Sequence, residues 1–258
     1  MEPAELTDDA FLGGRLAILQ PARGFRSGLD AILAAAAVPV RPGRPSRVLD
    51  AGSGVGVIGL AIGTREASAH VTMVERDTDM AAVARRNIER NSLADRVSIV
   101  AADIAAGGRA LHDPSRPEGL APASFDHLVT NPPYFASGTG TPPSVSANAG
   151  ARQMPSGSLD RWIAFLATAG KADASLTMIH RADALADVLA ALAPRFGRVR
   201  ILPVQPRADT PASRIVIGAV KGSRAALELR PALVLQDAEG RYLRSVDEIL
   251  RCGAPLPL

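Results

Sequence analysis

The chain has 258 residues, of which 47% are hydrophobic, 21% are charged and only 3% are aromatic. This is enough for one large domain whose core is built mainly from small aliphatic side chains. The formal net charge of +3 is compatible with binding nucleic acid without requiring it. The single cysteine, Cys252, excludes a disulfide framework and a cysteine metal cluster within one chain. We therefore expect no metal site and a reducing, cytoplasmic location.

The first 45 residues predict an extension that contributes to the binding pocket. After a turn at two glycines, residues 15–20 predict a short strand. Ser27 or Asp30 is expected to cap an Ala-rich helix that ends near Val38. This apolar stretch is too short to cross a bilayer, and the N-terminus shows no signal-like segment, so we expect no membrane partner.

Strands and helices alternate from residue 46 to residue 222, and this pattern predicts a Rossmann-like α/β domain. Its sheet is expected to be seven-stranded and mostly parallel, with helices on both faces. Residues 223–258 are expected to form a C-terminal extension packed on the same domain. The predicted strands are 48–50, 70–75, 97–100, 125–130, 176–180, 199–204 and 215–220, and the predicted helices are 55–62, 78–91, 159–169 and 181–192.

A glycine-rich loop follows the first predicted strand of this domain. Gly52, Gly54 and Gly56 alternate with other residues, which lets a ligand approach the backbone closely. Their spacing differs from the dinucleotide fingerprint, and the Lys-Ser/Thr pair of a phosphate-binding loop is absent from this stretch. Asp50, at the end of the strand, is a candidate partner for an amino group or a water molecule.

Two further acidic residues follow the next two predicted strands. Glu75 can accept both hydroxyls of a ribose, and Asp103 can accept from the N6 amino group of an adenine that packs on Ile104. Each acid alone is also compatible with a solvated strand end. Together with Asp50, however, they lie at successive carboxyl ends of strands, where open α/β sheets bind ligands. A pocket that suits an adenine, a ribose and an amino acid but has no phosphate-binding group predicts S-adenosylmethionine (SAM) as the cofactor.

The tetrapeptide Asn131-Pro132-Pro133-Tyr134 follows the predicted strand 125–130. Two prolines fix the backbone and cannot continue a strand, so the chain must leave the sheet in a rigid turn. The Asn131 amide oxygen and the Pro132 carbonyl can together accept both hydrogens of an –NH2 group. Tyr134 can stack on a flat base, and Phe135 either extends that platform or belongs to the core. Taken alone, this tetrapeptide is equally consistent with a proline turn capped by asparagine.

In their order and spacing, these segments resemble motifs I to IV of the class I methyltransferases. Asn-Pro-Pro-Tyr is typical of members of that class that methylate a planar nitrogen. The flanking segments are similar to those of the bacterial tRNA(Val) adenine-37 N6-methyltransferase family. One departure lies near Arg152, where relatives carry a more charged stretch, and its role is left open. The flanking segments that carry the resemblance include Gln20-Pro21, Gly24–Ala34, Ile179–Asp183, Pro206-Arg207, Pro211–Arg214 and Gly240–Tyr242.

The resemblance implies SAM-dependent methylation of the N6 amino group of an adenine at position 37 of a tRNA anticodon loop. In this interpretation residues 46–222 are the methyltransferase domain and tRNA is the partner. The implied catalytic residues are Asn131, Pro132 and Tyr134. Asp30 would line the cofactor or target pocket, or serve only as an acidic residue in the first helical turn. The implied substrate-binding residues are Phe135, Arg181 and Arg207.

Three alternatives remain open from the residues. The first is a glutamine-N5 protein methyltransferase that acts on release factors, whose substrate glutamine would present the same –NH2 group to Asn131. Such enzymes carry a separate helical N-terminal domain, and the first motif here begins at Asp50, which leaves little room for one. A guanine-N2 rRNA methyltransferase usually has Phe in place of Tyr134 and a duplicated domain. A non-catalytic SAM- or RNA-binding module would not need Asn131 and Tyr134. The sequence leaves the tRNA isoacceptor and the oligomeric state, monomer or homodimer, undetermined.

Overall fold

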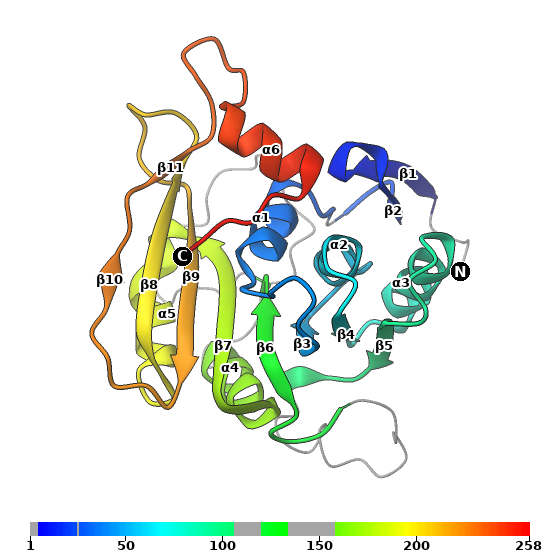
Figure 1. Cartoon of the computed structure of the whole chain (residues 1–258), viewed down its shortest axis with the longest axis horizontal. Helices are drawn as coiled ribbons and strands as arrows, with labels where there is room; N and C mark the ends of the chain where they lie inside the picture. The colour runs from blue at the N-terminus through cyan, green and yellow to red at the C-terminus, as the bar shows by residue number, and fades with distance from the viewer. Residues whose placement is uncertain (1–4, 25, 106–119, 134–157) are drawn as a thin grey trace.

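The computed structural model describes residues 5–24, 26–105, 120–133 and 158–258. Its centre is a nine-stranded sheet in the order β10-β8-β9-β7-β6-β3-β4-β5, with β11 also paired to β8 (Figure 1). Strand β9 is antiparallel to both of its neighbours, while the other neighbouring pairs of the sheet are parallel. The strands are β3 (Ser46–Ala51), β4 (Ala69–Glu75), β5 (Val97–Ala101), β6 (Phe125–Thr130), β7 (Gly170–Arg181), β8 (Phe196–Gln205), β9 (Arg214–Lys221), β10 (Glu228–Leu229) and β11 (Leu233–Val234).

Helices cover both faces of this sheet, because its central strands are apolar on both sides. Successive residues of a strand point to opposite faces. Val48 and Val129 therefore pack in one hydrophobic cluster and their neighbours Leu49 and Leu128 in a second. The first cluster lies against α1 (Leu29–Ala37), α2 (Val57–Arg65), α3 (Thr78–Arg90) and α6 (Arg244–Cys252), and the second against α4 (Ser158–Ala169) and α5 (Leu185–Leu192), which follows the short 3-10 helix η3 (Ala182–Ala184).

A separate N-terminal hairpin packs on α3. The hairpin consists of β1 (Leu6–Phe11) and β2 (Leu16–Pro21), joined by the 3-10 turn η1 (Leu12–Gly14). The buried side chain of Asn87 accepts a hydrogen bond from Leu19 N at 2.8 Å and donates to Leu19 O and Val55 O, both at 3.0 Å. One turn later, Asn91 bonds both backbone groups of Ala17. These two side chains fix the hairpin beside the segment that begins α2.

The predicted fold class is confirmed, with differences in detail. The seven predicted strands correspond to β3–β9, and the two short strands β10 and β11 extend the sheet beyond β8. Strand β1 was not predicted, because its acidic residues resemble a helix cap; Asp8 instead pairs with Arg90, and Asp9 with Arg26. The expected side-chain cap of α1 is wrong: its N-cap is Gly28, without a side-chain hydrogen bond.

The boundaries proposed at residues 45 and 222 stay a prediction. Segments on both sides of them contact the sheet or its helices, since Asn87 binds the hairpin and β10 and β11 pair with β8. Within the described part of the chain, no helix combines the length and apolar character needed to cross a membrane.

Candidate functional site

The predicted site residues gather at one edge of the sheet. Strands β3, β4, β5 and β6 are parallel neighbours, so their carboxyl ends lie at the same edge (Figure 1). Ala51, the last residue of β3, is paired with Val74 of β4 and with Thr130, the last residue of β6. The glycine-rich loop and Asn131 therefore leave the sheet from adjacent positions.

The glycine-rich loop combines a tightly packed side with an open side. Gly52, Gly54 and Gly56 have φ values of 75°, 56° and 96°, in the left-handed region that favours glycine. A Cβ atom at Gly52 would lie only 2.7 Å from the ring of Trp162. A Cβ atom at Gly54 would have no heavy atom within 4 Å among the described residues. The loop thus rests on Trp162 while its backbone at Gly54 faces space that a ligand can occupy.

Asp50 contributes an unpaired buried carboxyl oxygen beneath this loop. Its Oδ2 accepts from Gly59 N at 2.9 Å, whereas its Oδ1 has no hydrogen-bond partner in the described structure. Burial raises the pKa of Asp50 to about 7; the Gly59 hydrogen bond opposes this change and the charge of Glu75 adds to it. The Ser53 hydroxyl is also buried and has no hydrogen-bond partner among the described residues. Because buried polar groups are normally satisfied, these atoms fit a ligand that brings hydrogen-bond donors.

Glu75 lies at the end of β4 with its carboxylate held by the backbone. Its Oε2 accepts from Gly54 N at 2.9 Å and its Oε1 from Asp77 N at 2.8 Å. Each carboxylate oxygen has further lone pairs, so both can still accept a hydroxyl. Just beyond β5, Asp103 is exposed and the next residue, Ile104, is buried. An exposed carboxylate and a buried apolar side chain therefore lie at consecutive positions, an arrangement that suits an adenine ring with its amino group.

Two hydrogen bonds of Thr130 connect the end of β6 to its surroundings. Its Oγ1 donates to Ala51 O at 2.8 Å and accepts from Trp162 Nε1 at 3.0 Å. Asn131 follows directly and is partly buried. Neither Thr130 nor Trp162 was among the predicted site residues, and the one signal for Trp162 was that it is the single tryptophan of the chain.

The remaining predicted site residues are placed as follows. The carboxylate of Asp30, in the first turn of α1, accepts from Arg214 Nε at 2.8 Å. Arg181 is half-buried at the end of β7 and forms an ion pair with Asp183. Arg207 is exposed in the loop between β8 and β9, and no described residue forms an ion pair with it. Two predicted site residues, Tyr134 and Phe135, lie outside the described residues.

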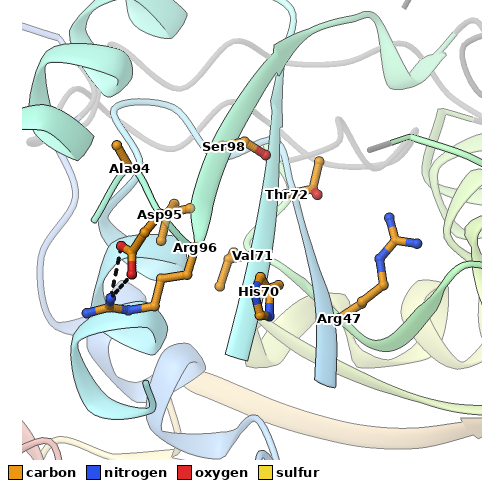
Figure 2. Close-up of a pocket in the computed structure, with 9 residues that line it drawn as sticks. Arg47, His70, Val71, Thr72, Ala94, Asp95, Arg96 and Ser98 are labelled. Atoms are coloured by element: carbon orange, nitrogen blue, oxygen red, sulfur yellow. Dashed lines mark hydrogen bonds and ion pairs between the residues drawn. The ribbon is translucent and has the colours of Figure 1, made fainter. Parts of the chain in front are cut away.

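Two surface hollows lie at the opposite edge of the sheet. The larger, about 410 Å³, is lined by the starts of β3, β4 and β5, and Figure 2 shows that its Arg96 turns toward Asp95. The smaller, about 330 Å³, contains the ion pair between Lys171 and Asp126. Neither hollow overlaps the candidate site. Among the residues that the structure describes, no group of three or more His, Cys, Asp or Glu side chains is suited to hold a metal ion.

Residues 31–149 match the methyltransferase small domain family, a range that contains the glycine-rich loop, the acids Asp50, Glu75 and Asp103, and Asn131. A predicted O-methyltransferase from Agrobacterium tumefaciens has a similar solved structure, with a TM-score of 0.72 and 29% sequence identity over 89% of this chain and 99% of that chain. The fold is that of the class I methyltransferases. A SAM-dependent O-methyltransferase from Thermotoga maritima shares it, with a TM-score of 0.51, 19% identity, and coverage of 79% of this chain and 68% of that chain. S-adenosylmethionine is the methyl donor of this class.

Curated relatives of this chain carry a more specific description. The tRNA1(Val) (adenine(37)-N6)-methyltransferase of Enterobacter sp. is 34% identical over 143 residues, which is 54% of this chain and 53% of the relative. The protein of the same description from Porphyromonas gingivalis is 32% identical over 136 residues, 52% of this chain and 51% of the relative. The chain thus spans about half the length of the curated relatives it matches.

Proposed function

We propose that this protein transfers a methyl group from SAM to the N6 amino group of an adenine in tRNA, at position 37 of the anticodon loop. The observation that carries this proposal is the position of Asn131-Pro132-Pro133 directly after Thr130, the last residue of β6. Thr130 is paired with Ala51 of β3, and Ala51 directly precedes the glycine-rich loop. The description of the curated relatives supports the choice of acceptor. The site of action would be the cytoplasm.

In this proposal the buried and backbone-held acids bind the cofactor. Asp50 Oδ1 would accept from the amino group of its amino-acid part, which supplies the donor that this oxygen lacks. Glu75 would accept the ribose hydroxyls while its own position is fixed by Gly54 N and Asp77 N. Asp103 would accept from the adenine amino group and Ile104 would pack on the ring. The bound sulfonium supplies an electrophilic methyl group at this edge of the sheet.

Asn131 and Pro132 would orient the methyl acceptor. The lone pair of an exocyclic amine is delocalised into its ring, so this nitrogen is a weak nucleophile. By accepting both N–H hydrogens, Asn131 Oδ1 and the Pro132 carbonyl would hold the nitrogen in line with the methyl group and stabilise the positive charge that develops on it. The methylated nitrogen then loses a proton readily, and no strong general base is required.

The remaining residues would bind the RNA. Tyr134 would stack on the target base and Phe135 would extend the platform; such stacking contributes about 1–3 kcal/mol per base. An unpaired loop base is easier to unstack than a base in a duplex, which favours an anticodon loop. Arg207 would contact phosphate directly, whereas Arg181 would first have to release Asp183.

The proposal is tested by incubating the protein with methyl-labelled SAM and, separately, unmodified total tRNA, release factors and ribosomes. Label is expected in N6-methyladenine of tRNA. Label in a glutamine side chain or in N2-methylguanine would contradict the assigned acceptor. tRNA affinity is also expected to fall with salt, with a log–log slope of about −0.7 for each phosphate contacted.

Asn131→Ala is the matching active-site variant. It is expected to lower methyl transfer by about 100-fold or more, because a preorganised polar contact to the reacting group is lost. Its SAM dissociation constant, measured by calorimetry, is expected to stay within about threefold of wild type, since Asn131 is assigned to the acceptor. Full transfer activity in Asn131→Ala would refute the role given to this residue.

A further inference from the structure

The hydroxyl of Thr130 occupies an unusual place between two functional segments. It donates to Ala51 O at 2.8 Å and accepts from Trp162 Nε1 at 3.0 Å, and Thr130 and Trp162 are both buried. Ala51 directly precedes Gly52, the first glycine of the glycine-rich loop, which we call the cofactor loop (residues 52–56). Thr130 directly precedes Asn131. We call this pair of hydrogen bonds the Thr130 link. It joins the end of β3, where the cofactor loop begins, to the end of β6, where the turn at Asn131-Pro132-Pro133 begins.

The ring of Trp162 also contacts the cofactor loop, at Gly52. A Cβ atom placed on Gly52 would lie 2.7 Å and 2.8 Å from Cζ2 and Cη2 of the indole. One side chain of α4 therefore touches Gly52 with its ring and binds Thr130 with its Nε1–H group. A shift of Trp162 would therefore displace both the cofactor loop and the turn that follows Thr130.

The link lies where the backbone ladder of the sheet ends. The last paired residues of β3 and β6 are Ala51 and Thr130. Pro132 and Pro133 lack N–H groups, so they cannot donate a further ladder hydrogen bond. Beyond this point the position of the turn relative to β3 depends on side-chain contacts, and those of Thr130 are the hydrogen bonds of the link.

Packing alone does not require these polar groups. Trp162 and Ala51, the two partners of Thr130, belong to an apolar cluster that includes Leu49 and Leu128, so a valine at position 130 would keep a similar shape without a buried hydroxyl. Instead, the hydroxyl and the indole N–H satisfy each other and the Ala51 carbonyl in one fixed direction. A fully satisfied buried polar network is a means of defining one geometry.

We infer that Trp162 and Thr130 are positioning residues for methyl transfer: through the Thr130 link they hold Asn131 at a fixed distance from the cofactor loop. The inference rests on the proposed function of Asn131. Methyl transfer requires the acceptor nitrogen, the methyl carbon and the sulfur to be in line, and a displacement of about 1 Å costs on the order of 100-fold in rate. Losing the link should thus slow the transfer step while leaving cofactor binding in place.

Three variants and a matched control separate positioning from packing. Thr130→Val keeps the shape and removes the hydroxyl, whereas Thr130→Ser keeps the hydroxyl. Trp162→Phe keeps an aromatic ring and removes the Nε1–H donor. The control is Thr168→Val, because Thr168 lies on the same helix and its hydroxyl donates only to Ala164 O, at 2.9 Å, away from the link.

The readout is the single-turnover rate of methyl transfer to tRNA at saturating SAM, divided by the fraction of protein that binds SAM. Thr130→Val and Trp162→Phe are expected to lower this rate by about 10- to 100-fold. Thr130→Ser and Thr168→Val are expected to stay within about threefold of wild type. Because Trp162 is the only tryptophan, its fluorescence reports SAM binding in the threonine variants, and calorimetry does so for Trp162→Phe. All SAM dissociation constants should change less than about threefold.

Two results would overturn the inference. One is an unchanged single-turnover rate in Thr130→Val, even if its melting temperature falls, since the link would then serve stability alone. The other is a SAM affinity that weakens in parallel with the rate, because the link would then shape only the cofactor loop. If the wild type methylates a glutamine or a guanine instead of adenine, the proposed acceptor is wrong; the same variants are then compared on that acceptor, where the same rate ratios are expected.

Discussion

Replacing Gly52 by alanine tests how the cofactor loop is held against α4. The new Cβ would meet two carbon atoms of Trp162 at 2.7 Å and 2.8 Å, well inside van der Waals contact. The residue would also have to keep a φ of 75°, which L-residues rarely adopt. Gly54→Ala is the matched control, because its φ is 56° and its Cβ would meet no heavy atom of the described structure within 4 Å.

The two effects can be assigned separate magnitudes. The left-handed backbone costs about 1–2 kcal/mol for an alanine, and this applies to both variants. Overpacking in a well-packed region adds about 1–3 kcal/mol, and this applies to Gly52→Ala alone. We therefore expect the free energy of unfolding to fall by about 2–5 kcal/mol in Gly52→Ala and by about 1–2 kcal/mol in Gly54→Ala.

The assay is urea unfolding of the cofactor-free protein, followed by circular dichroism, in a double-mutant cycle with Trp162→Leu. The leucine side chain lacks the ring atoms that the alanine would meet. In that background, Gly52→Ala should cost only its backbone strain, which gives a coupling energy of about 1–3 kcal/mol. Equal costs for Gly52→Ala and Gly54→Ala, or no coupling to Trp162→Leu, would refute the contact as the cause.

Three further predictions concern groups whose partners are defined. Asn87→Ala should lower the free energy of unfolding by about 2–4 kcal/mol, because backbone groups of Leu19 and Val55 lose their hydrogen-bond partner. Urea unfolding measures this change, and a loss below about 0.5 kcal/mol would contradict the prediction. Between pH 4 and 7 the stability of the cofactor-free wild type should fall relative to Asp50→Asn by about 3 kcal/mol, since the raised pKa of Asp50 makes its ionisation costly in the folded state only. Saturating SAM should reduce that difference, and parallel pH profiles would show that Asp50 does not titrate as described. Glu75→Gln should weaken SAM binding at least about 10-fold in calorimetry, because the amide cannot accept from both backbone N–H groups. Glu66→Gln, at the other edge of the sheet, serves as its control. Equal SAM affinities of the two variants would contradict the role of Glu75.

The parts of the fold that local patterns specify could be predicted from the sequence. Strand β6 was predicted with its observed bounds, because an apolar run is ended there by two prolines. The first half of β7 was not predicted, because its residues from Gly170 to Ser175 are small or polar. They are strand because Ser175 pairs with His127 on one side and with Val220 on the other. That information lies in distant segments.

In the candidate site, too, some residues could be placed from the sequence and others depend on distant segments. The spacing of Asp50, Glu75 and Asn131 along the chain was sufficient to place them at one edge of a parallel sheet, and the structure brings their strands together there. The contacts of Thr130 and Trp162 could not be predicted in this way. They depend on the direction in which α4 crosses the sheet, and nothing local to either residue encodes that direction.

The sheet order also has a consequence for synthesis of the chain on the ribosome. Strand β8 leaves the ribosome before β9, yet in the sheet β9 lies between β8 and β7. Until Arg214–Lys221 has emerged, β7 has one open edge and β8 has no partner strand at all, since β10 and β11 follow later still. Unpaired apolar strands are prone to intermolecular pairing. The nascent chain thus exposes unpaired apolar strand edges in the interval between the emergence of β8 and the emergence of β9, and a holding chaperone would act in that interval.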